Sequence, residues 1–157
     1  MRALGYIPDP PKGVNERPDF DAALRFDRFT PPSSADLTSR VVEVLDQGRL
    51  GSCVAQAALQ AIRIRDQIER VNAEPPLGSR LFLYYLSRAT HHATGYDTGT
   101  NYRSAFGALA RFGVPPEDAW PYDDNRGPGA AFMRMPPGDA FRRAFDARRT
   151  IRYERIY

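Results

Sequence analysis

Residues 46–55 read Asp-Gln-Gly-Arg-Leu-Gly-Ser-Cys-Val-Ala and lead the only cysteine of the chain, Cys53, into a long apolar stretch. Apolar side chains continue at helical spacing, which predicts a helix from about Ser52 to Val71. Its first three turns are apolar nearly all round, as in a buried helix, whereas the second half is predicted to expose Arg63, Arg65, Asp66 and Arg70. Cys53 is therefore expected at the N-terminus of a core helix.

The residues around Cys53 are those that a nucleophilic thiol needs. The helix dipole and the free N–H groups of the first turn favour a thiolate at this position. Gly48 and Gly51 permit a tight approach into the helix, and the side-chain amide of Gln47 can donate a hydrogen bond. Together with the Cys53 backbone N–H, Gln47 could hold the oxyanion that forms when a thiolate attacks a carbonyl. The alternative is an inert cysteine packed as a small hydrophobe.

Three further helices and one strand follow from the sequence pattern. Ser79 is predicted to cap a helix that runs to about Arg88. A third helix is predicted over Tyr102 to Phe112, with Gly113 as its C-terminal cap. Asp139 is predicted to cap a short fourth helix, Ala140 to Arg148, and Thr150 to Tyr157 has the composition of a strand.

These elements suggest a domain organisation. Residues 1–44 form an extended arm whose regularly spaced aromatic residues are typical of a strap lying on a core. Residues 45–149 form the helical domain, and residues 150–157 are expected to begin a second domain. Several carboxylates in the connecting segments are predicted to be solvated turn formers, namely Asp97, Glu117, Asp118, Asp123 and Asp124.

The pattern Gln-Gly-x-x-Gly-Ser-Cys resembles the active-site signature of papain-like cysteine peptidases. It departs from the signature at Leu50, where that family usually has a disulfide cysteine, and at Val54, where it usually has an aromatic residue. The likeness covers most of residues 5–157 and continues, in order, through residues 77–85, 99–106, 113–117 and 120–122. The opening residues 5–9 resemble a bacterial branch without a long inhibitory propeptide.

The resemblance implies an α+β fold, in which a mainly helical left domain is followed by the start of a β-rich right domain. It implies that Cys53 is the nucleophile and that Gln47 stabilises the oxyanion. It also implies substrate contacts for Gly51, Gly99 and Tyr102, with the backbone of Gly99 binding the substrate main chain. In this family a histidine, held by an asparagine, acts as general base and lies roughly 130–150 residues after the cysteine, beyond Tyr157.

The chain is therefore expected to be a fragment of a cysteine-type peptidase, with little turnover on its own. His91 and His92 are its only histidines, and they lie in a polar loop where neither a catalytic nor a metal-binding role is expected. The alternatives are a non-catalytic peptide-binding domain of the same ancestry and, more weakly, a thiol redox sensor. Alkylation of Cys53 at the rate of an ordinary thiol would favour the binding domain.

The amino-acid composition limits the classes of cofactor and binding partner that we expect. A single cysteine excludes an intramolecular disulfide and a cysteine-based metal site, and no cofactor is expected. The net charge is +3, and the late arginines, interrupted by acidic residues, are interpreted as a solvated face and not as a nucleic-acid site. The residues before Gly13 lack a signal-peptide stretch, and no apolar run is long enough for a membrane span, so a cytoplasmic location is expected. The expected partners are a peptide or protein substrate and the missing C-terminal domain of the same fold.

Overall fold

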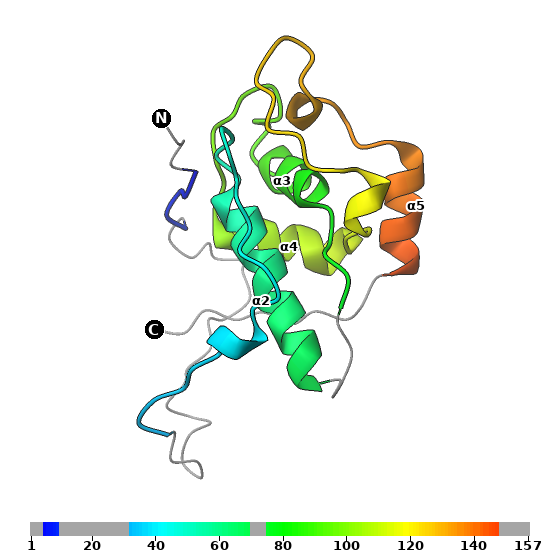
Figure 1. Ribbon diagram of the computed structural model, residues 1–157. Helices are drawn as coiled ribbons and strands as arrows, with labels where there is room; N and C mark the ends of the chain where they lie inside the picture. The colour runs from blue at the N-terminus through cyan, green and yellow to red at the C-terminus, as the bar shows by residue number, and fades with distance from the viewer. Residues whose placement is uncertain (1–4, 10–31, 70–74, 148–157) are drawn as a thin grey trace, which may run out of the picture.

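A computed structural model describes residues 5–9, 32–69 and 75–147 of the chain. The α-helices among them are α2 (Cys53–Glu69), α3 (Arg80–Ala89), α4 (Tyr102–Phe112) and α5 (Gly138–Asp146), shown in Figure 1. Short 3-10 turns occur at Thr38–Arg40, Glu117–Ala119 and Ala131–Met133. Each helix of this part of the chain is too short or too polar to cross a lipid bilayer.

The core is built around α3, which packs against both α2 and α4. Its residues Leu81, Phe82, Leu83 and Tyr84 are all fully buried, so α3 is enclosed on most of its sides. Apolar residues of the neighbouring helices and of the turn before α2 complete the core, among them Leu50, Val54, Leu59 and Leu109. Buried surface of this kind is the main favourable contribution to folding.

Helix α2 has the predicted position, although its exposure differs from the prediction. It begins at Cys53 and is described as far as Glu69. The interpretation of a helix buried all round is wrong for one face, because Ala57 and Ala61 are exposed. The predicted exposure of Arg63 and Asp66 is also wrong, since both are buried. Burial of Arg63 is compatible with its charge because its guanidinium donates to the Pro75 carbonyl at 2.8 Å and to the Glu43 carboxylate at 2.7 Å.

The caps predicted for α3 and α4 are present. The Ser79 hydroxyl accepts a hydrogen bond from the Phe82 backbone N–H at 3.2 Å, as an N-cap residue does. Gly113 ends α4 with a φ of 74°, in the left-handed region, and its N–H donates to the Leu109 carbonyl. Asn101 caps the start of α4 through its side-chain oxygen, which accepts from the Ser104 N–H at 2.8 Å.

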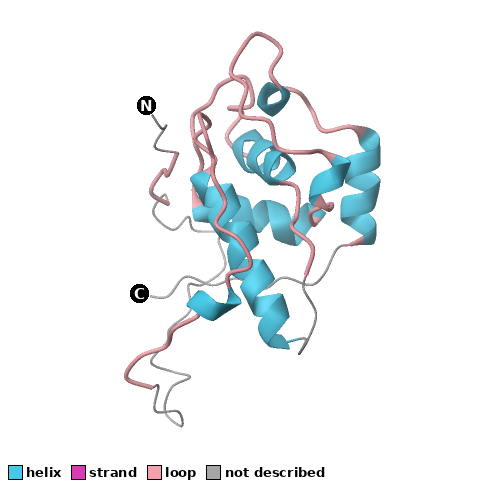
Figure 2. Cartoon of the chain, in the orientation of Figure 1, coloured by secondary structure: helices cyan, strands magenta, loops and turns pink. Residues whose placement is uncertain are grey.

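The predicted cap of the last helix is wrong, and the predicted strand is not tested. Helix α5 begins one residue before Asp139, and Pro137 at its N-cap position makes no side-chain bond. Asp139 instead lies in the first turn and pairs with Arg142, where a carboxylate suits the positive end of the helix dipole. Residues 150–157 lie outside the described residues. The described part contains isolated bridges but no strand (Figure 2), so the start of a β-rich domain is not evident in it.

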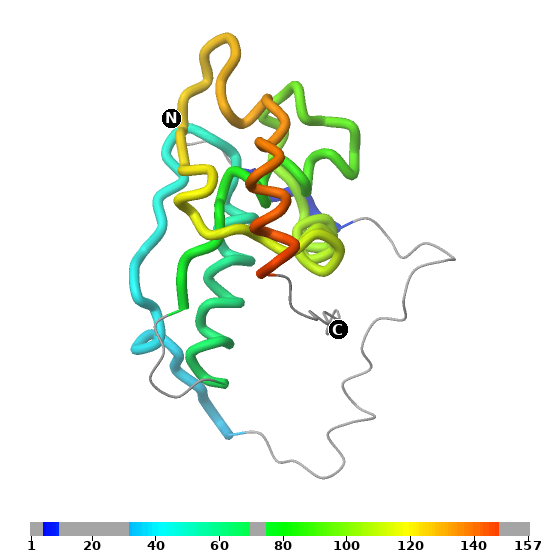
Figure 3. The backbone as a smooth tube through the Cα atoms, turned by 90° about the vertical axis from the view of Figure 1, so that its right-hand side faces the viewer, coloured from blue at the N-terminus to red at the C-terminus, as the bar shows by residue number. Residues whose placement is uncertain are grey.

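Two extended segments lie on the helical core. Residues 41–50 run alongside α2, as the two views in Figures 1 and 3 show. The Gln60 side chain of α2 donates a hydrogen bond to the Glu43 carbonyl of this segment. Residues 5–9, a described part of the predicted arm and from here on called simply the arm, pair with the loop before α4 through a parallel bridge between Tyr6 and Thr100. The first segment therefore lies beside the helix that carries Cys53, and the second lies beside the loop before α4.

Candidate active site

The turn before Cys53 depends on glycine at position 48. Gly48 has a φ of 57°, a left-handed conformation that residues with a side chain rarely adopt, and its N–H donates to the Asp46 carboxylate at 2.9 Å. The turn continues with a bond of 3.3 Å from the Leu50 N–H to the Gln47 carbonyl. Leu50 is fully buried, so this apolar side chain anchors the turn to the core at the position where the resemblance places a disulfide cysteine.

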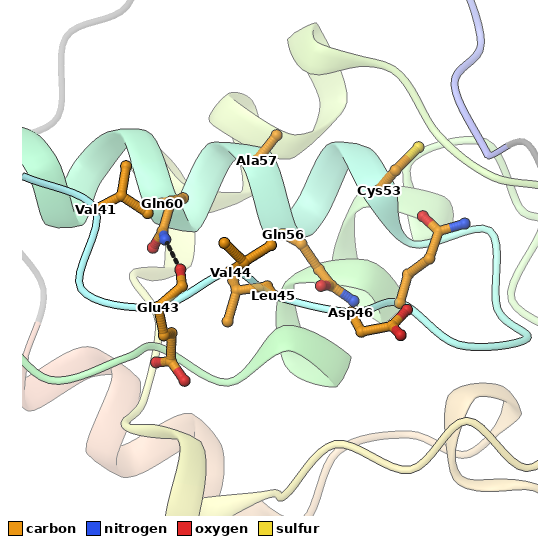
Figure 4. Close-up of a pocket in the computed structure, with 10 residues that line it drawn as sticks. Val41, Glu43, Val44, Leu45, Asp46, Cys53, Gln56, Ala57 and Gln60 are labelled. Carbon is orange, nitrogen blue, oxygen red and sulfur yellow. Dashed lines mark hydrogen bonds between the residues drawn. The ribbon is translucent and has the colours of Figure 1, made fainter. Parts of the chain in front are cut away.

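Cys53 and Gln47 line one cavity of about 430 Å³ between α2 and the extended segment 41–47. Figure 4 shows that its lining comes from these two elements, including Gln56 and Ala57 and, about one turn further along α2, Gln60. Cys53 is the single free cysteine and is partly exposed, so its sulfur is neither fully buried nor fully in solvent. The structure thus brings the predicted nucleophile and the predicted oxyanion donor to the same cavity.

Gly51 and Gly99 approach each other closely beside Cys53. A Cβ added to Gly51 would lie 3.4 Å from the Gly99 nitrogen and 3.1 Å from the Cα of Gly5. Gly99 has a φ of 75°, and a Cβ there would meet the carbonyl oxygen of Gly5 at 2.1 Å. Two of the predicted substrate contacts therefore face each other, and residue 5 of the arm lies against both.

The arm already occupies the backbone edge next to Gly99. The Thr100 N–H donates to the Gly5 carbonyl at 2.8 Å, and the Thr100 carbonyl accepts from the Ile7 N–H at 2.9 Å. The Asp9 carboxylate accepts from the Arg103 N–H at 3.0 Å, in the first turn of α4. This is the pattern by which an extended peptide adds to an exposed edge.

Tyr102, the third predicted substrate contact, lies close to the cysteine and to the arm. Its ring is 5.9 Å from that of Tyr6 and 6.3 Å from that of Phe106, measured between ring centroids. Burial raises the pKa of the Tyr102 hydroxyl, and the nearby Cys53, Tyr6 and Asp9 raise it further. Tyr102 is thus within electrostatic reach of Cys53.

Asp97 and Tyr84 connect the two glycines, and the sequence analysis missed both. The Asp97 carboxylate accepts from the Gly51 N–H at 2.9 Å and from the Tyr84 hydroxyl, which in turn accepts from the Gly99 N–H at 3.1 Å. The prediction of Asp97 as a solvated turn former is wrong, since its side chain is only 3% exposed and pairs with Arg126. Tyr84 lies within the predicted second helix, and a tyrosine that is buried in a helix usually has a polar partner for its hydroxyl.

Arg88 holds the loop that carries Asp97. It is fully buried, and its guanidinium donates to the carbonyls of Tyr84, Ala93, Thr94, Tyr96 and Phe132. A buried cation is tolerated here because these backbone oxygens satisfy its N–H groups. Sequence reasoning missed this role because its acceptors are backbone atoms, which no sequence motif marks.

Neither histidine lines the Cys53 cavity. His91 is exposed, but its Nε2 pairs with the Ser104 hydroxyl at 2.6 Å and with the Asn101 side chain at 3.2 Å, so it ties the loop to α4. His92 has a φ of 55° in the same loop. These positions agree with the expectation that the histidines lie on the surface, and they give His91 a structural role that was not predicted.

The fold is similar to that of a cysteine protease. The structure aligns with that of xylellain, a cysteine protease from Xylella fastidiosa, with a TM-score of 0.79 and 30% sequence identity, over 98% of this chain and 58% of that one. A peptidase C1-like protein of Acanthamoeba polyphaga mimivirus, itself uncharacterized, is 33% identical over 112 residues, which is 71% of this chain and 34% of that protein. No protein-family model matches the chain.

Both comparisons point to the papain-like cysteine protease family. The chain spans about a third of the mimivirus protein and somewhat more than half of xylellain. The likeness therefore supports a cysteine peptidase-like fold.

Proposed function

We propose that this chain is the nucleophile-bearing half of a cysteine-type peptidase of the papain-like family. The observation that supports this most directly is that Cys53 and Gln47 line the same cavity. The turn that joins these two residues along the sequence also contains Gly51. A thiol at a helix N-terminus beside an amide donor is the arrangement that attack on a carbonyl requires.

In the proposed reaction the Cys53 thiolate attacks the carbonyl carbon of a peptide bond. A C–S bond forms, and the carbonyl π electrons move to the oxygen, which the Gln47 amide and the Cys53 N–H stabilise. When the tetrahedral intermediate collapses, the C–N bond breaks and the leaving amine takes a proton. We propose that a histidine from outside residues 1–157, in the C-terminal domain of the same fold, supplies that proton and then activates the water that hydrolyses the thioester.

Gly51, Gly99 and Tyr102 are the proposed substrate contacts. The backbones of Gly51 and Gly99 approach each other closely, and the Thr100 edge pairs with an extended backbone in the structure itself. The substrate class is accordingly a peptide or an unfolded protein segment, bound in extended conformation.

An activated ester tests the proposal without the histidine, because p-nitrophenolate leaves without a proton. Residues 1–157 should release about one equivalent of p-nitrophenolate from p-nitrophenyl acetate in a burst, with the acyl group left on Cys53. Cys53→Ala should show no burst. Because the chain has one cysteine, mass spectrometry locates the acyl group unambiguously. A rate no faster than that of the same chain unfolded in urea would reject the enzyme proposal.

The second candidate is a non-catalytic peptide-binding domain of the same ancestry, favoured by the arm that already pairs with the Thr100 edge. Iodoacetamide separates the two. Alkylation of Cys53 at pH 6 much faster than that of the unfolded chain supports the peptidase, whereas equal rates support the binding domain.

A further inference from the structure

The hydroxyl of Tyr122 lies between the two sides of the proposed oxyanion site. It donates to the backbone carbonyl of Gln47 at 2.8 Å and lies 2.6 Å from the hydroxyl of Ser52, the residue directly before Cys53. A phenol has one proton, and the Gln47 carbonyl takes it, so the Ser52 hydroxyl must donate to Tyr122. One side chain thus contacts both the residue that carries the amide donor and the neighbour of the nucleophile.

The hydrogen bonds at Tyr122 belong to a longer series of hydrogen bonds. The Gln56 amide donates to the Ser52 hydroxyl at 3.0 Å, Ser52 donates to Tyr122, and Tyr122 donates to Gln47. All the donors point in one direction, and hydrogen bonds aligned in this way polarise and strengthen one another. Ser52 is fully buried and Gln56 nearly so, which shields most of these hydrogen bonds from competing water.

Two further contacts hold Tyr122 in place, one at its backbone N–H and one at its ring. Its backbone N–H donates to the Glu117 carboxylate at 3.0 Å, and the Arg80 guanidinium lies 4.3 Å from the centre of its ring. Arg80 and Glu117 are ion-paired at 2.7 Å, so the prediction of Glu117 as a solvated turn former is wrong. Burial raises the pKa of Tyr122, and its hydroxyl keeps the proton that it donates.

We propose that Tyr122 is a positioning residue that sets the distance between the Gln47 amide and the Cys53 N–H. Oxyanion stabilisation requires both donors to converge on one oxygen to within a few tenths of an ångström. Gln47 and Cys53 are separated by a turn containing two glycines, and the Tyr122 hydroxyl bridges the two ends of that turn. The proposal rests on the proposed function, since it concerns the same reaction.

Two reagents distinguish positioning from mere stability. Acylation by p-nitrophenyl acetate develops charge on a carbonyl oxygen and needs the oxyanion donors, whereas alkylation by iodoacetamide displaces iodide and does not. In residues 1–157, Tyr122→Phe should slow the acylation of Cys53 about tenfold, less than the loss of a whole oxyanion donor, and leave alkylation within about twofold. Tyr96→Phe, on an exposed ring, is the matched control and should change neither rate.

A double-mutant cycle tests whether Tyr122 acts through Gln47. If it does, Tyr122→Phe should have less than about a twofold effect in a Gln47→Ala background. Equal losses in both reactions, or an undiminished loss in that background, would overturn the proposal, as would unchanged acylation. If the unmodified chain shows no burst, the proposed function itself fails, and this proposal falls with it. Should Tyr122→Phe not fold, Ser52→Ala removes the adjoining hydrogen bond. The same effects on acylation and alkylation are then expected of Ser52→Ala, and the same results would overturn the proposal.

Discussion

Replacement of Gly5 by alanine should release the arm from the Thr100 edge. The added Cβ would lie 1.7 Å from the Gly51 carbonyl oxygen and 2.2 Å from its carbon. Both are backbone atoms of the turn that leads to Cys53, so no side-chain rotation relieves the overlap. Gly95→Ala is a matched control, because a Cβ there meets nothing within 4 Å.

The magnitude follows from the contacts that residues 5–7 of the arm would lose. Its two backbone bonds to Thr100 contribute roughly 1 kcal/mol each. The contact between Tyr6 and Tyr102 contributes about 1 kcal/mol more. A loss of about 3 kcal/mol corresponds to a factor on the order of 100 in the occupancy of the edge.

Amide hydrogen exchange and ester kinetics measure this release separately. The Thr100 amide should exchange on the order of 100-fold faster in Gly5→Ala than in the unmodified chain or in Gly95→Ala. A dipeptidyl p-nitrophenyl ester, which needs the edge, should acylate Cys53 faster, whereas p-nitrophenyl acetate should react at an unchanged rate. Unchanged protection of Thr100 in Gly5→Ala would refute the reasoning, since it would mean that the arm tolerates the methyl group.

Three further predictions concern stability. Arg88→Met should lower the free energy of unfolding by about 3–5 kcal/mol in urea titrations, because the buried Phe132 carbonyl loses its donor and the loop before Asp97 loses three bonds. Ser79→Ala should cost about 2 kcal/mol, since the hydroxyl both caps α3 and donates to the Trp120 carbonyl at 2.7 Å. Burial, together with the hydrogen bond to Asp97, raises the pKa of Tyr84 above the ordinary value of 10.0. The free energy of unfolding should therefore stay constant below pH 10 and decrease as the pH rises above it. Urea titrations at pH 9 and pH 11 should show a smaller decrease for Tyr84→Phe than for the unmodified chain.

The sequence predicted the helices well because their ends carry local signals. Ser79 and Gly113 mark termini by side-chain capping and by glycine conformation, and both act within one turn of the chain. Asp139 gave the same kind of signal and misled, because the helix begins one residue earlier, at Gly138, and Asp139 lies inside the first turn, where a carboxylate also suits the helix dipole.

The residues around Cys53 divide in the same way. Cys53, Gln47 and Gly51 stand in one short segment, and the sequence alone was enough to nominate them. Asp97 and Tyr122 contact that segment from 46 and 75 positions away along the chain, at Gly51 and Gln47 respectively. A carboxylate between glycines is typical of a solvated turn, and only the fold shows that this one is buried.

These two contacts explain how the turn before Cys53 is held without a covalent link. By the resemblance of its motif, Leu50 stands where papain-like peptidases usually have a disulfide cysteine, and a chain with one cysteine has no intramolecular disulfide. In the structure, Asp97 binds the Gly51 N–H on one side of the turn, and Tyr122 binds the Gln47 carbonyl on the other. A disulfide constrains the unfolded chain as well, whereas these hydrogen bonds exist only in the folded state. The geometry at Cys53 therefore depends on the packing of α3 and of the loop over residues 90–101. Substitutions at Arg88 should change the position of the thiol, because Arg88 holds the loop that carries Asp97.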